Sequence, residues 1–197
     1  MQTKQRQRMS TEILVLGAIL TALVVVLQMM GSFIRFGMFS ISLVLVPIVI
    51  GASVGGAKLG AWLGGVFGIV VLISGDAAAF LAISVPGTII TVMVKGIACG
   101  LVAGLIYKWL SKYDRYASVV ISALVCPVVN TGVFLLGCSV FFMDTIKTWA
   151  LADYGENVVG YLFLGLAGVN FLVEVAINVL LTPAIVRLLD FRNKKKA

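Results

Sequence analysis

Two ionisable side chains, Lys95 and Glu174, lie within stretches of the sequence that are otherwise almost entirely apolar. A charge inside an apolar helix is costly, and membrane proteins retain one mostly where it binds a solute, an ion or another charge. Asn170 precedes Glu174 by four residues, so the two side chains share one face of a helix. Asn130 and Thr131 place an amide and a hydroxyl in a third apolar stretch. Together these residues predict a solute pocket, with Lys95 as the counter-charge of an anionic group and the other side chains as hydrogen-bond partners.

A structural role for the same polar residues is the alternative interpretation. Lys95 and Glu174 could neutralise each other, and the asparagines could join helices through hydrogen bonds worth about 1 kcal/mol each in membranes. Substituting Lys95 by alanine separates the two interpretations. Loss of solute affinity supports the pocket, whereas loss of thermal stability alone supports the structural role.

Several kinds of chemistry are excluded by what the sequence lacks. The 197 residues contain no histidine, which removes Ser–His hydrolysis, His-ligated metals and histidine proton relays. Residues 51–58 loosely resemble a phosphate-binding loop, but Leu59 stands where the motif needs a serine or threonine for magnesium. The three cysteines show no metal-ligand spacing. We therefore expect no catalytic residue, no metal and no cofactor, and we do not expect an enzyme.

The composition indicates which elements must position these residues. Hydrophobic residues make up 61% of the chain and charged residues 12%, whereas soluble domains have about half and a quarter. About 20 apolar residues span a bilayer, so six such helices fit in one integral membrane domain over residues 1–197. We expect a tight turn at residues 55–58 and a loop over the polar residues 144–157. The predicted transmembrane helices cover about residues 13–30, 41–54, 59–74, 86–110, 117–143 and 158–189.

The basic residues are distributed unequally between the two sides of this predicted all-α bundle. Twelve of the 15 lysines and arginines fall on the side of the two termini, whereas the opposite loops hold only Arg35 and Lys147, and Lys95 is within a helix. Cytoplasmic flanks of membrane helices carry such an excess. We therefore predict six helices with both termini in the cytoplasm, in a multi-pass protein of the plasma membrane. No nucleic-acid partner is expected, because no soluble basic face is left to bind one.

Two further groups of residues have alternative interpretations. Arg35 and its aromatic neighbours, in the first outer loop, could cover the pocket as a lid or form an interfacial aromatic belt. Small residues recur at every fourth position at Ala18 and Ala22, and again as glycines at residues 56–68 and 96–104. Such faces let helices approach closely, either within the chain or with a partner. For the glycines, packing within the chain is the favoured interpretation.

Several segments carry a family resemblance when they are taken in order. They are the Ala18-xxx-Ala22 pair, LVPIVIGA at 45–52 followed by the glycines of 60–68, residues 86–96 with Gly100 and Gly104, VNTGVF at 129–134 and NFLVE at 170–174. In this order and spacing they resemble the substrate-binding S components of energy-coupling factor (ECF) vitamin transporters. The resemblance extends over essentially the whole chain.

The resemblance implies that the protein captures a small-molecule micronutrient from outside a bacterial cell, under a lid formed by the first outer loop with Arg35. It also implies that Ala18 and Ala22 dock on a transmembrane coupling protein that carries two ABC-type ATPases. ATP use would then belong to the partner, in agreement with the failed phosphate-binding loop.

The identity of the solute is less closely determined. Lys95 with Asn130 suits a carboxylate-bearing vitamin such as pantothenate, and folate-, lipoate- or biotin-like ligands stay open. The absence of histidine and the few aromatic residues expected in the pocket disfavour a thiamine-type site. The alternative from another class is a self-sufficient small secondary transporter or channel, although no convincing inverted repeat supports it.

Overall fold

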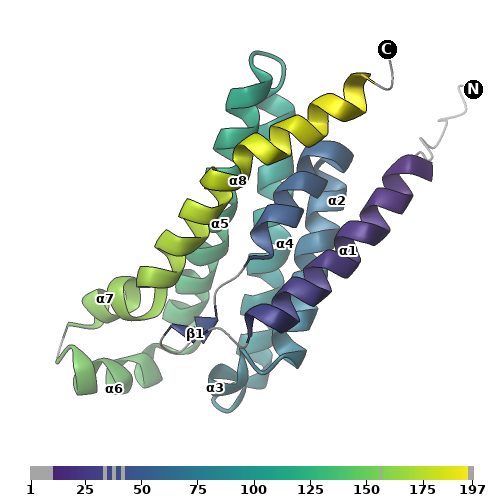
Figure 1. Ribbon diagram of the computed structural model, residues 1–197. Helices are drawn as coiled ribbons and strands as arrows, with labels where there is room; N and C mark the ends of the chain where they lie inside the picture. The colour runs from purple at the N-terminus through teal and green to yellow at the C-terminus, as the bar shows by residue number, and fades with distance from the viewer. Residues whose placement is uncertain (1–10, 33–34, 37–38, 41–42, 156, 195–197) are drawn as a thin grey trace, which may run out of the picture.

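The computed structural model is a bundle of long helices closed at one end by short elements, and it describes residues 11–194 except 33–34, 37–38, 41–42 and 156 (Figure 1). Apart from one two-stranded hairpin, the described elements are helical. In chain order they are α1 (Thr11–Gly31), β1 (Arg35–Phe36), β2 (Phe39–Ser40), α2 (Leu45–Ile73), α3 (Ala78–Leu81), α4 (Val85–Leu110), α5 (Arg115–Phe141), α6 (Met143–Asp153), α7 (Val158–Gly160), the π-helix η1 (Tyr161–Gly168) and α8 (Val169–Lys194).

Five of the described helices are long and apolar enough to cross a membrane: α1, α2, α4, α5 and the part of α8 from Asn170 to Arg187. Large apolar side chains on these helices point away from the bundle, and Ile73, Val140 and Leu180 are each more than 70% exposed. Such a surface is compatible with lipid rather than with water. The predicted class, an all-α multi-pass membrane protein, is therefore confirmed.

Helix α2 is folded in two at Gly56, where the sequence predicts a tight turn. Gly56 has φ 74° and ψ −174°, a conformation that side chains with a Cβ atom rarely adopt. After this residue the chain runs back along itself. The packing shows this reversal, since a Cβ built on Gly60 would lie 2.9 Å from the Cβ of Ala52. Gly51 likewise faces Leu63. The run from Leu45 to Ile73 therefore consists of two antiparallel legs.

The second leg of α2 and helix α4 are in backbone contact along a ridge of glycines. A Cβ atom at Gly64 would overlap the carbonyl oxygen of Gly96, and one at Gly60 would overlap that of Gly100. Without side chains the two helices approach far closer than leucine-lined helices could. The prediction that these glycines pack within the chain is confirmed.

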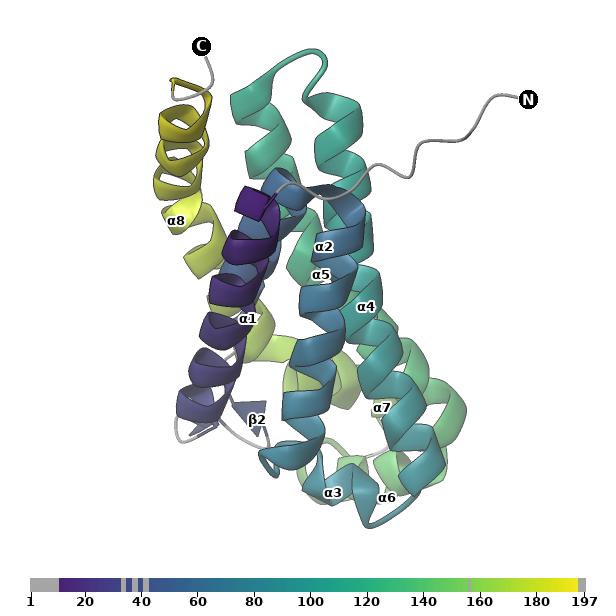
Figure 2. The same cartoon turned by 90° about the vertical axis from the view of Figure 1, so that its right-hand side faces the viewer.

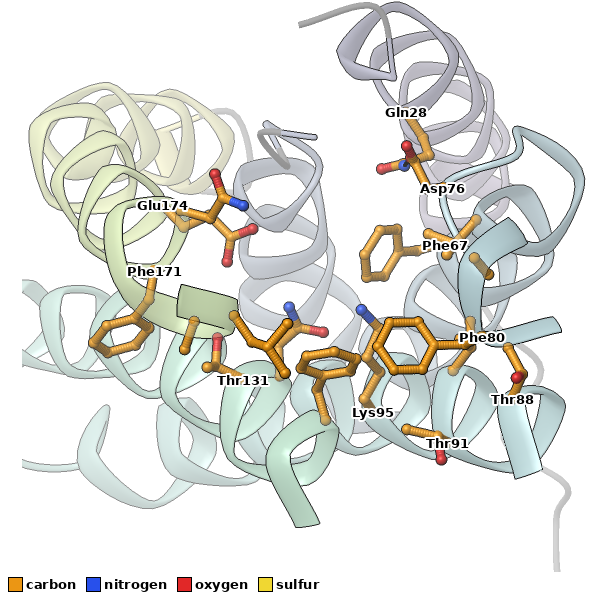
Figure 3. A pocket seen from close by; sticks show the side chains of 18 of the residues that line it. Gln28, Phe67, Asp76, Phe80, Thr88, Thr91, Lys95, Thr131, Phe171 and Glu174 are labelled. Atoms are coloured by element: carbon orange, nitrogen blue, oxygen red, sulfur yellow. Dashed lines mark hydrogen bonds between the residues drawn. The ribbon is translucent and has the colours of Figure 1, made fainter. Parts of the chain in front are cut away.

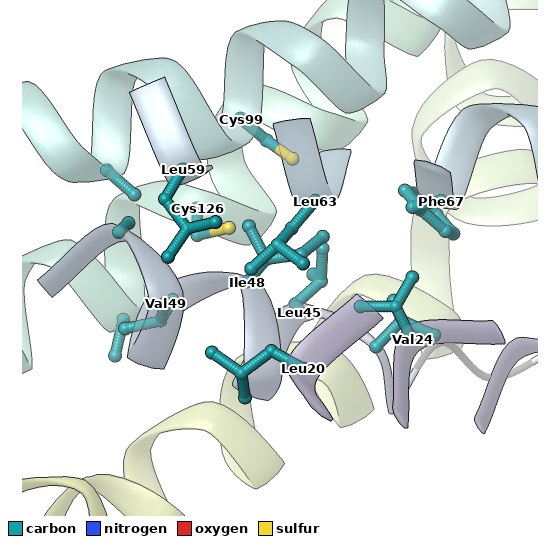
Figure 4. Packing of buried hydrophobic residues seen from close by; sticks show 14 of the residues in the cluster. Leu20, Val24, Leu45, Ile48, Val49, Leu59, Leu63, Phe67, Cys99 and Cys126 are labelled. Carbon is teal, nitrogen blue, oxygen red and sulfur yellow. The ribbon is translucent and has the colours of Figure 1, made fainter. Parts of the chain in front are cut away.

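The apolar core lies where α1, both legs of α2, α4 and α5 meet (Figure 4). Val24, Leu45, Ile48 and Leu63 are completely buried there. The thiols of Cys99 and Cys126 are buried in the same cluster as small apolar groups. This core fixes α4 and α5 against α2, and these helices carry Lys95 and Asn130.

Short elements close one end of the bundle, opposite the start of α1 and the end of α8 (Figure 1, Figure 2). Helices α3 and α6 both lie at this end. The prediction of a loop over residues 144–157 was wrong, because most of that stretch is helix α6. Ile146 and Ala150 are one helical turn apart and both fully buried, so the segment is an amphipathic helix despite its polar residues.

Candidate solute-binding cavity

A cavity lies between α2, α4, α5, η1 and α8, on the side of the bundle nearer α3 (Figure 3). It contains about 780 Å³ of empty space, including the part open to the outside. Small-molecule sites are typically apolar clefts with a few convergent polar groups. Its polar lining consists of Gln28, Asp76, Thr88, Thr91, Lys95, Asn130, Thr131, Asn170 and Glu174.

All five membrane-embedded residues that the sequence analysis selected for a pocket line this cavity. Lys95 comes from α4, Asn130 and Thr131 come from α5, and Asn170 and Glu174 come from α8. Figure 3 shows the side chains of Lys95 and Glu174 entering the cavity from different walls. The fold thus brings together polar residues from three helices, although their role in binding a solute stays a prediction.

The ammonium group of Lys95 lies between aromatic rings. Its Nζ atom is 5.6 Å from the ring centroid of Phe67 and 5.2 Å from that of Phe134, within the range of cation–π interactions. No ion pair joins Lys95 to Glu174 or Asp76 within the described part of the chain. Lys95 and Glu174 line the same cavity, and the choice between a solute pocket and mutual neutralisation of the two charges stays a prediction.

Asn170, Glu174 and Asn178 form a polar stripe at every fourth position of α8, and only part of this stripe faces the cavity. Glu174 is 6% exposed and lines the cavity together with Asn170. Asn178, one turn further along, instead donates a hydrogen bond from Nδ2 to the backbone carbonyl of Glu174 at 2.8 Å. The hydroxyl of Thr182 in turn donates to the carbonyl of Asn178. The first two residues of the stripe thus face the cavity, and Asn178 has a structural role.

The cavity-lining residues of α4, α5 and α8 hold three buried polar atoms that have no hydrogen-bond partner among the described residues. They are Oδ1 of Asn130, Oδ1 of Asn170 and Oγ1 of Thr91. Buried polar atoms in folded proteins nearly always have a partner, and leaving one unpaired costs about 1–3 kcal/mol. Each of the three atoms is covered by the protein itself, so none of them is open to the cavity in this structure.

Asp76 and Gln28 are cavity residues that the sequence analysis did not select. Gln28 on α1 is 2% exposed and donates a hydrogen bond from Nε2 to Oδ2 of Asp76 at 2.6 Å. Ser74 donates to the same oxygen at 3.3 Å. The signal in the sequence was Gln28, a lone amide near the end of an apolar helix. Its contact with Asp76 ties α1 to the segment that follows α2.

Aromatic rings make up much of the apolar wall, so the prediction of few aromatic residues in the pocket was wrong. Phe67, Phe80, Phe134, Phe142 and Phe171 all line the cavity. The ring of Phe80 makes edge-to-face contacts with Phe134 at 5.7 Å and with Phe142 at 5.0 Å between centroids. Scarcity of aromatic rings therefore no longer counts against a thiamine-type solute, whereas the absence of histidine still does.

The remaining predicted residues lie away from the cavity or outside what the structure describes. Arg35 is in strand β1, paired with Ser40 of β2, but the placement of its side chain is outside the described residues, so its role in a lid stays a prediction. Ala18 and Ala22 are exposed on α1, whereas Leu20 and Val24 on the opposite face are buried against the core. The two alanines therefore face away from the bundle.

Comparison with known proteins gives one match. The family model for the substrate-specific component of ECF transporters matches residues 12–186. The matched segment includes all the polar residues of the cavity wall and both alanines of α1. No curated protein and no solved structure matches the chain.

Proposed function

The chain belongs to the family of ECF transporter substrate-specific components, and from this membership and its cavity we propose that it captures a micronutrient outside the cell for an ATP-driven importer. Members of the family are transporter subunits rather than enzymes. The observation that supports the proposal most is Lys95, whose side chain lines a cavity in an otherwise apolar bundle.

The proposed topology has six membrane crossings, with both termini in the cytoplasm of a bacterial cell. The two legs of α2 account for two crossings, and α1, α4, α5 and α8 account for one each. An even number puts the start of α1 and the end of α8 on one side, and the basic residues assign that side to the cytoplasm. Residues 1–197 then form a single integral membrane domain of the plasma membrane. The cavity lies toward the outer face.

The solute that we propose is a carboxylate-bearing vitamin, with pantothenate as the first candidate. The cation–π contacts of Lys95 are weak compared with a charge-assisted hydrogen bond to a carboxylate in apolar surroundings. Asn130 and Thr131 on α5, and Asn170 and Glu174 on α8, would form hydrogen bonds to the rest of the molecule. Arg35, on the connection between α1 and α2, is the proposed lid residue.

The proposed docking surface is the outward face of α1. Ala18 and Ala22 are exposed there at helical spacing, so a helix of another protein can approach the backbone of α1 closely. Helix α1 packs mainly against α2 within the chain, which leaves this face uncovered. The partner in this proposal is a transmembrane coupling protein that carries two ABC-type ATPases.

Calorimetric titration of the purified chain in lipid nanodiscs with pantothenate tests the proposed site. Replacing Lys95 by alanine should weaken binding by about 10- to 100-fold, the value of one hydrogen bond to a charged group. The control is Lys147→Ala, since Lys147 pairs with Asp144 at the surface. If Lys95→Ala lowers the melting temperature but leaves the affinity for pantothenate unchanged, Lys95 is structural.

Reconstitution tests the proposal that this chain binds the solute while its partner proteins use ATP to drive transport. Liposomes that contain the chain together with a coupling protein and its ATPases should accumulate solute when ATP is supplied. Liposomes that contain the chain alone should not. Accumulation by the chain alone would instead identify a self-sufficient secondary transporter.

A further inference from the structure

A hydrogen bond on the outside of the bundle joins α1 to the second leg of α2. The indole Nε1 of Trp62 donates to the hydroxyl of Thr21 at 3.2 Å, and that hydroxyl donates to the backbone carbonyl of Gly17 at 2.7 Å. Trp62 is nevertheless 62% exposed, so most of its ring projects from the bundle. Figure 2 shows α1 and α2 side by side on this surface. A large apolar ring is therefore fixed between two helices at a place where lipid or another protein can contact it.

The direction of the indole N–H distinguishes Trp62 from a tryptophan of an aromatic belt. In such belts the ring lies in the apolar layer while its N–H reaches headgroups or water. An indole has a single N–H, and that of Trp62 is bound to Thr21. The position of this ring is thus set by α1 rather than by the membrane surface.

The ring also borders the small-residue face of α1. Thr21 follows Ala18 by three residues and directly precedes Ala22, so it lies at the edge of the face that these alanines form. Packed helices lie about 8–10 Å apart, and a helix with its side chains is about 10–12 Å wide. A helix seated on the alanines is therefore wide enough to contact Trp62 on the neighbouring leg of α2.

From this arrangement we propose that the docking surface extends from α1 onto the second leg of α2, with Trp62 as its aromatic anchor and Thr21 as the residue that positions the ring. The inference rests on the proposed docking role of Ala18 and Ala22. The occupant is a transmembrane helix of the coupling protein that lies across both helices, with small residues toward the alanines and an apolar side chain toward the indole. Tryptophan is among the residues that contribute most to binding at protein interfaces, because it buries a large area with few rotatable bonds.

Photo-crosslinking tests where the partner helix lies. Benzoylphenylalanine replaces Trp62, Val25 or Trp109 in turn, and each chain is reconstituted in liposomes with a coupling protein and its two ATPases, here called the coupling complex. Val25 follows Ala22 by three residues on the same face of α1, whereas Trp109 is 64% exposed on α4. We expect crosslinks to the coupling protein from the first two positions and none from the third.

The crosslinking pattern separates this inference from the proposed docking role of α1. A crosslink from position 25 without one from position 62, or equal crosslinking from positions 62 and 109, would overturn the inference and leave docking through α1 intact. The absence of a crosslink from both position 25 and position 62 would contradict the inference and the docking role together.

Substitutions measure the contribution of the ring. Trp62→Ala should weaken binding of the coupling complex about 30-fold, a change typical of an interface hot spot. Trp109→Ala is the matched control, because it removes an equally exposed tryptophan, and it should leave the binding unchanged. Thermal unfolding of each variant without its partner shows whether the chain is still folded. Equal effects of the two variants on binding of the complex would identify Trp62 as an ordinary belt residue and overturn the inference.

A double-mutant cycle tests the role of Thr21 with changes smaller than the loss of the ring. Trp62→Phe keeps an aromatic ring and removes the N–H, and Thr21→Val keeps the shape of the side chain and removes the hydroxyl. Each should weaken binding of the coupling complex about threefold, the value of one hydrogen bond between membrane helices. The double variant should be no weaker than either single variant, because both remove the same hydrogen bond. Independent effects, about ninefold in the double variant, would contradict the positioning role of Thr21.

Discussion

The two sides of the cavity are built in different ways. On one side α4 is in backbone contact with α2 through Gly60, Gly64, Gly96 and Gly100, so the two helices are as close as their backbones allow. On the other side α8 follows the π-helix η1, and Gly132 of α5 has no atom within 4 Å of where a Cβ would lie. A groove with about 730 Å³ of empty space, open to the surroundings, runs between α5 and the η1–α8 segment on that side.

The solute that we propose would meet two differently packed walls in this cavity. The tightly packed side carries Lys95 and Thr91 on α4, so the backbone that bears the positive charge is closely packed. The loosely packed side carries Asn170 and Glu174 in the first two turns of α8, after the π-helix η1. π-Helices are rare in proteins, and those that occur are often at functional sites. We interpret the first side as a frame that recognises the charge and the second as a wall that adjusts to the body of the solute.

The largest effect is expected from a methyl group in the glycine ridge. A Cβ at Gly64 would overlap the carbonyl of Gly96, so Gly64→Ala must separate α2 from α4 and should destabilise the protein by about 3 kcal/mol. Thermal unfolding can be followed with a thiol-reactive dye, because Cys99, Cys126 and Cys138 are all buried. The neighbouring variant Gly65→Ala is the control, since its Cβ would make an ordinary 3.6 Å contact with Ile97. Equal melting temperatures for the two variants would mean that the ridge is not a tight contact.

A smaller effect is expected at the turn that positions the second leg of α2. Gly56 has φ 74°, so Gly56→Ala should cost about 2 kcal/mol through backbone strain, although no atom lies within 4 Å of the added methyl group. The same dye assay measures it. The affinity of the folded protein for pantothenate should not change, because Gly56 is not on the cavity wall. An unchanged melting temperature would contradict the reversal at this residue.

The smallest effect, with the opposite sign, is expected on the adaptable side. Gly132 lies in the middle of α5 with open space around it, so Gly132→Ala should stabilise the protein by about 0.5 kcal/mol through a lower entropy of the unfolded chain. Replacing glycine by alanine would then destabilise the protein at Gly64, on one side of the cavity, and stabilise it at Gly132, on the other side. If Gly132→Ala destabilised the protein as much as Gly64→Ala, the two sides of the cavity would not differ in packing.

The sequence was most informative where a residue disagreed with its surroundings. Lys95, Asn130 and Glu174 stand out because lipid and an apolar core both exclude polar side chains, and all three line the cavity. The reversal near Gly56 could be predicted because consecutive glycines and a lysine interrupt an apolar run. The family could be recognised as well, because the order of several such segments is more specific than any one of them.

Other parts of the site could not be predicted, because their residue types are found equally in lipid-facing, core and pocket positions. A phenylalanine in an apolar helix suits lipid, core and pocket equally, so nothing marked Phe67 or Phe134 as neighbours of Lys95. Asp76 follows the end of α2 and has the composition of an ordinary loop residue, and only the tertiary structure places it against Gln28. Helix α6 was not predicted, because its polar residues made the segment resemble a loop and hid the helical spacing of Ile146 and Ala150.

The reversal at Gly56 also sets how the protein fits its bilayer. The first leg of α2, from Leu45 to Gly55, has 11 residues and therefore rises only about 16 Å. A hydrocarbon layer is about 30 Å thick, so in the six-crossing arrangement this leg is about half as long as the layer it crosses. Such hydrophobic mismatch is relieved by local thinning of the lipid or by tilting of the neighbouring helices. Membrane thickness would then act on the protein most strongly next to α1, the helix whose outer face carries Ala18 and Ala22.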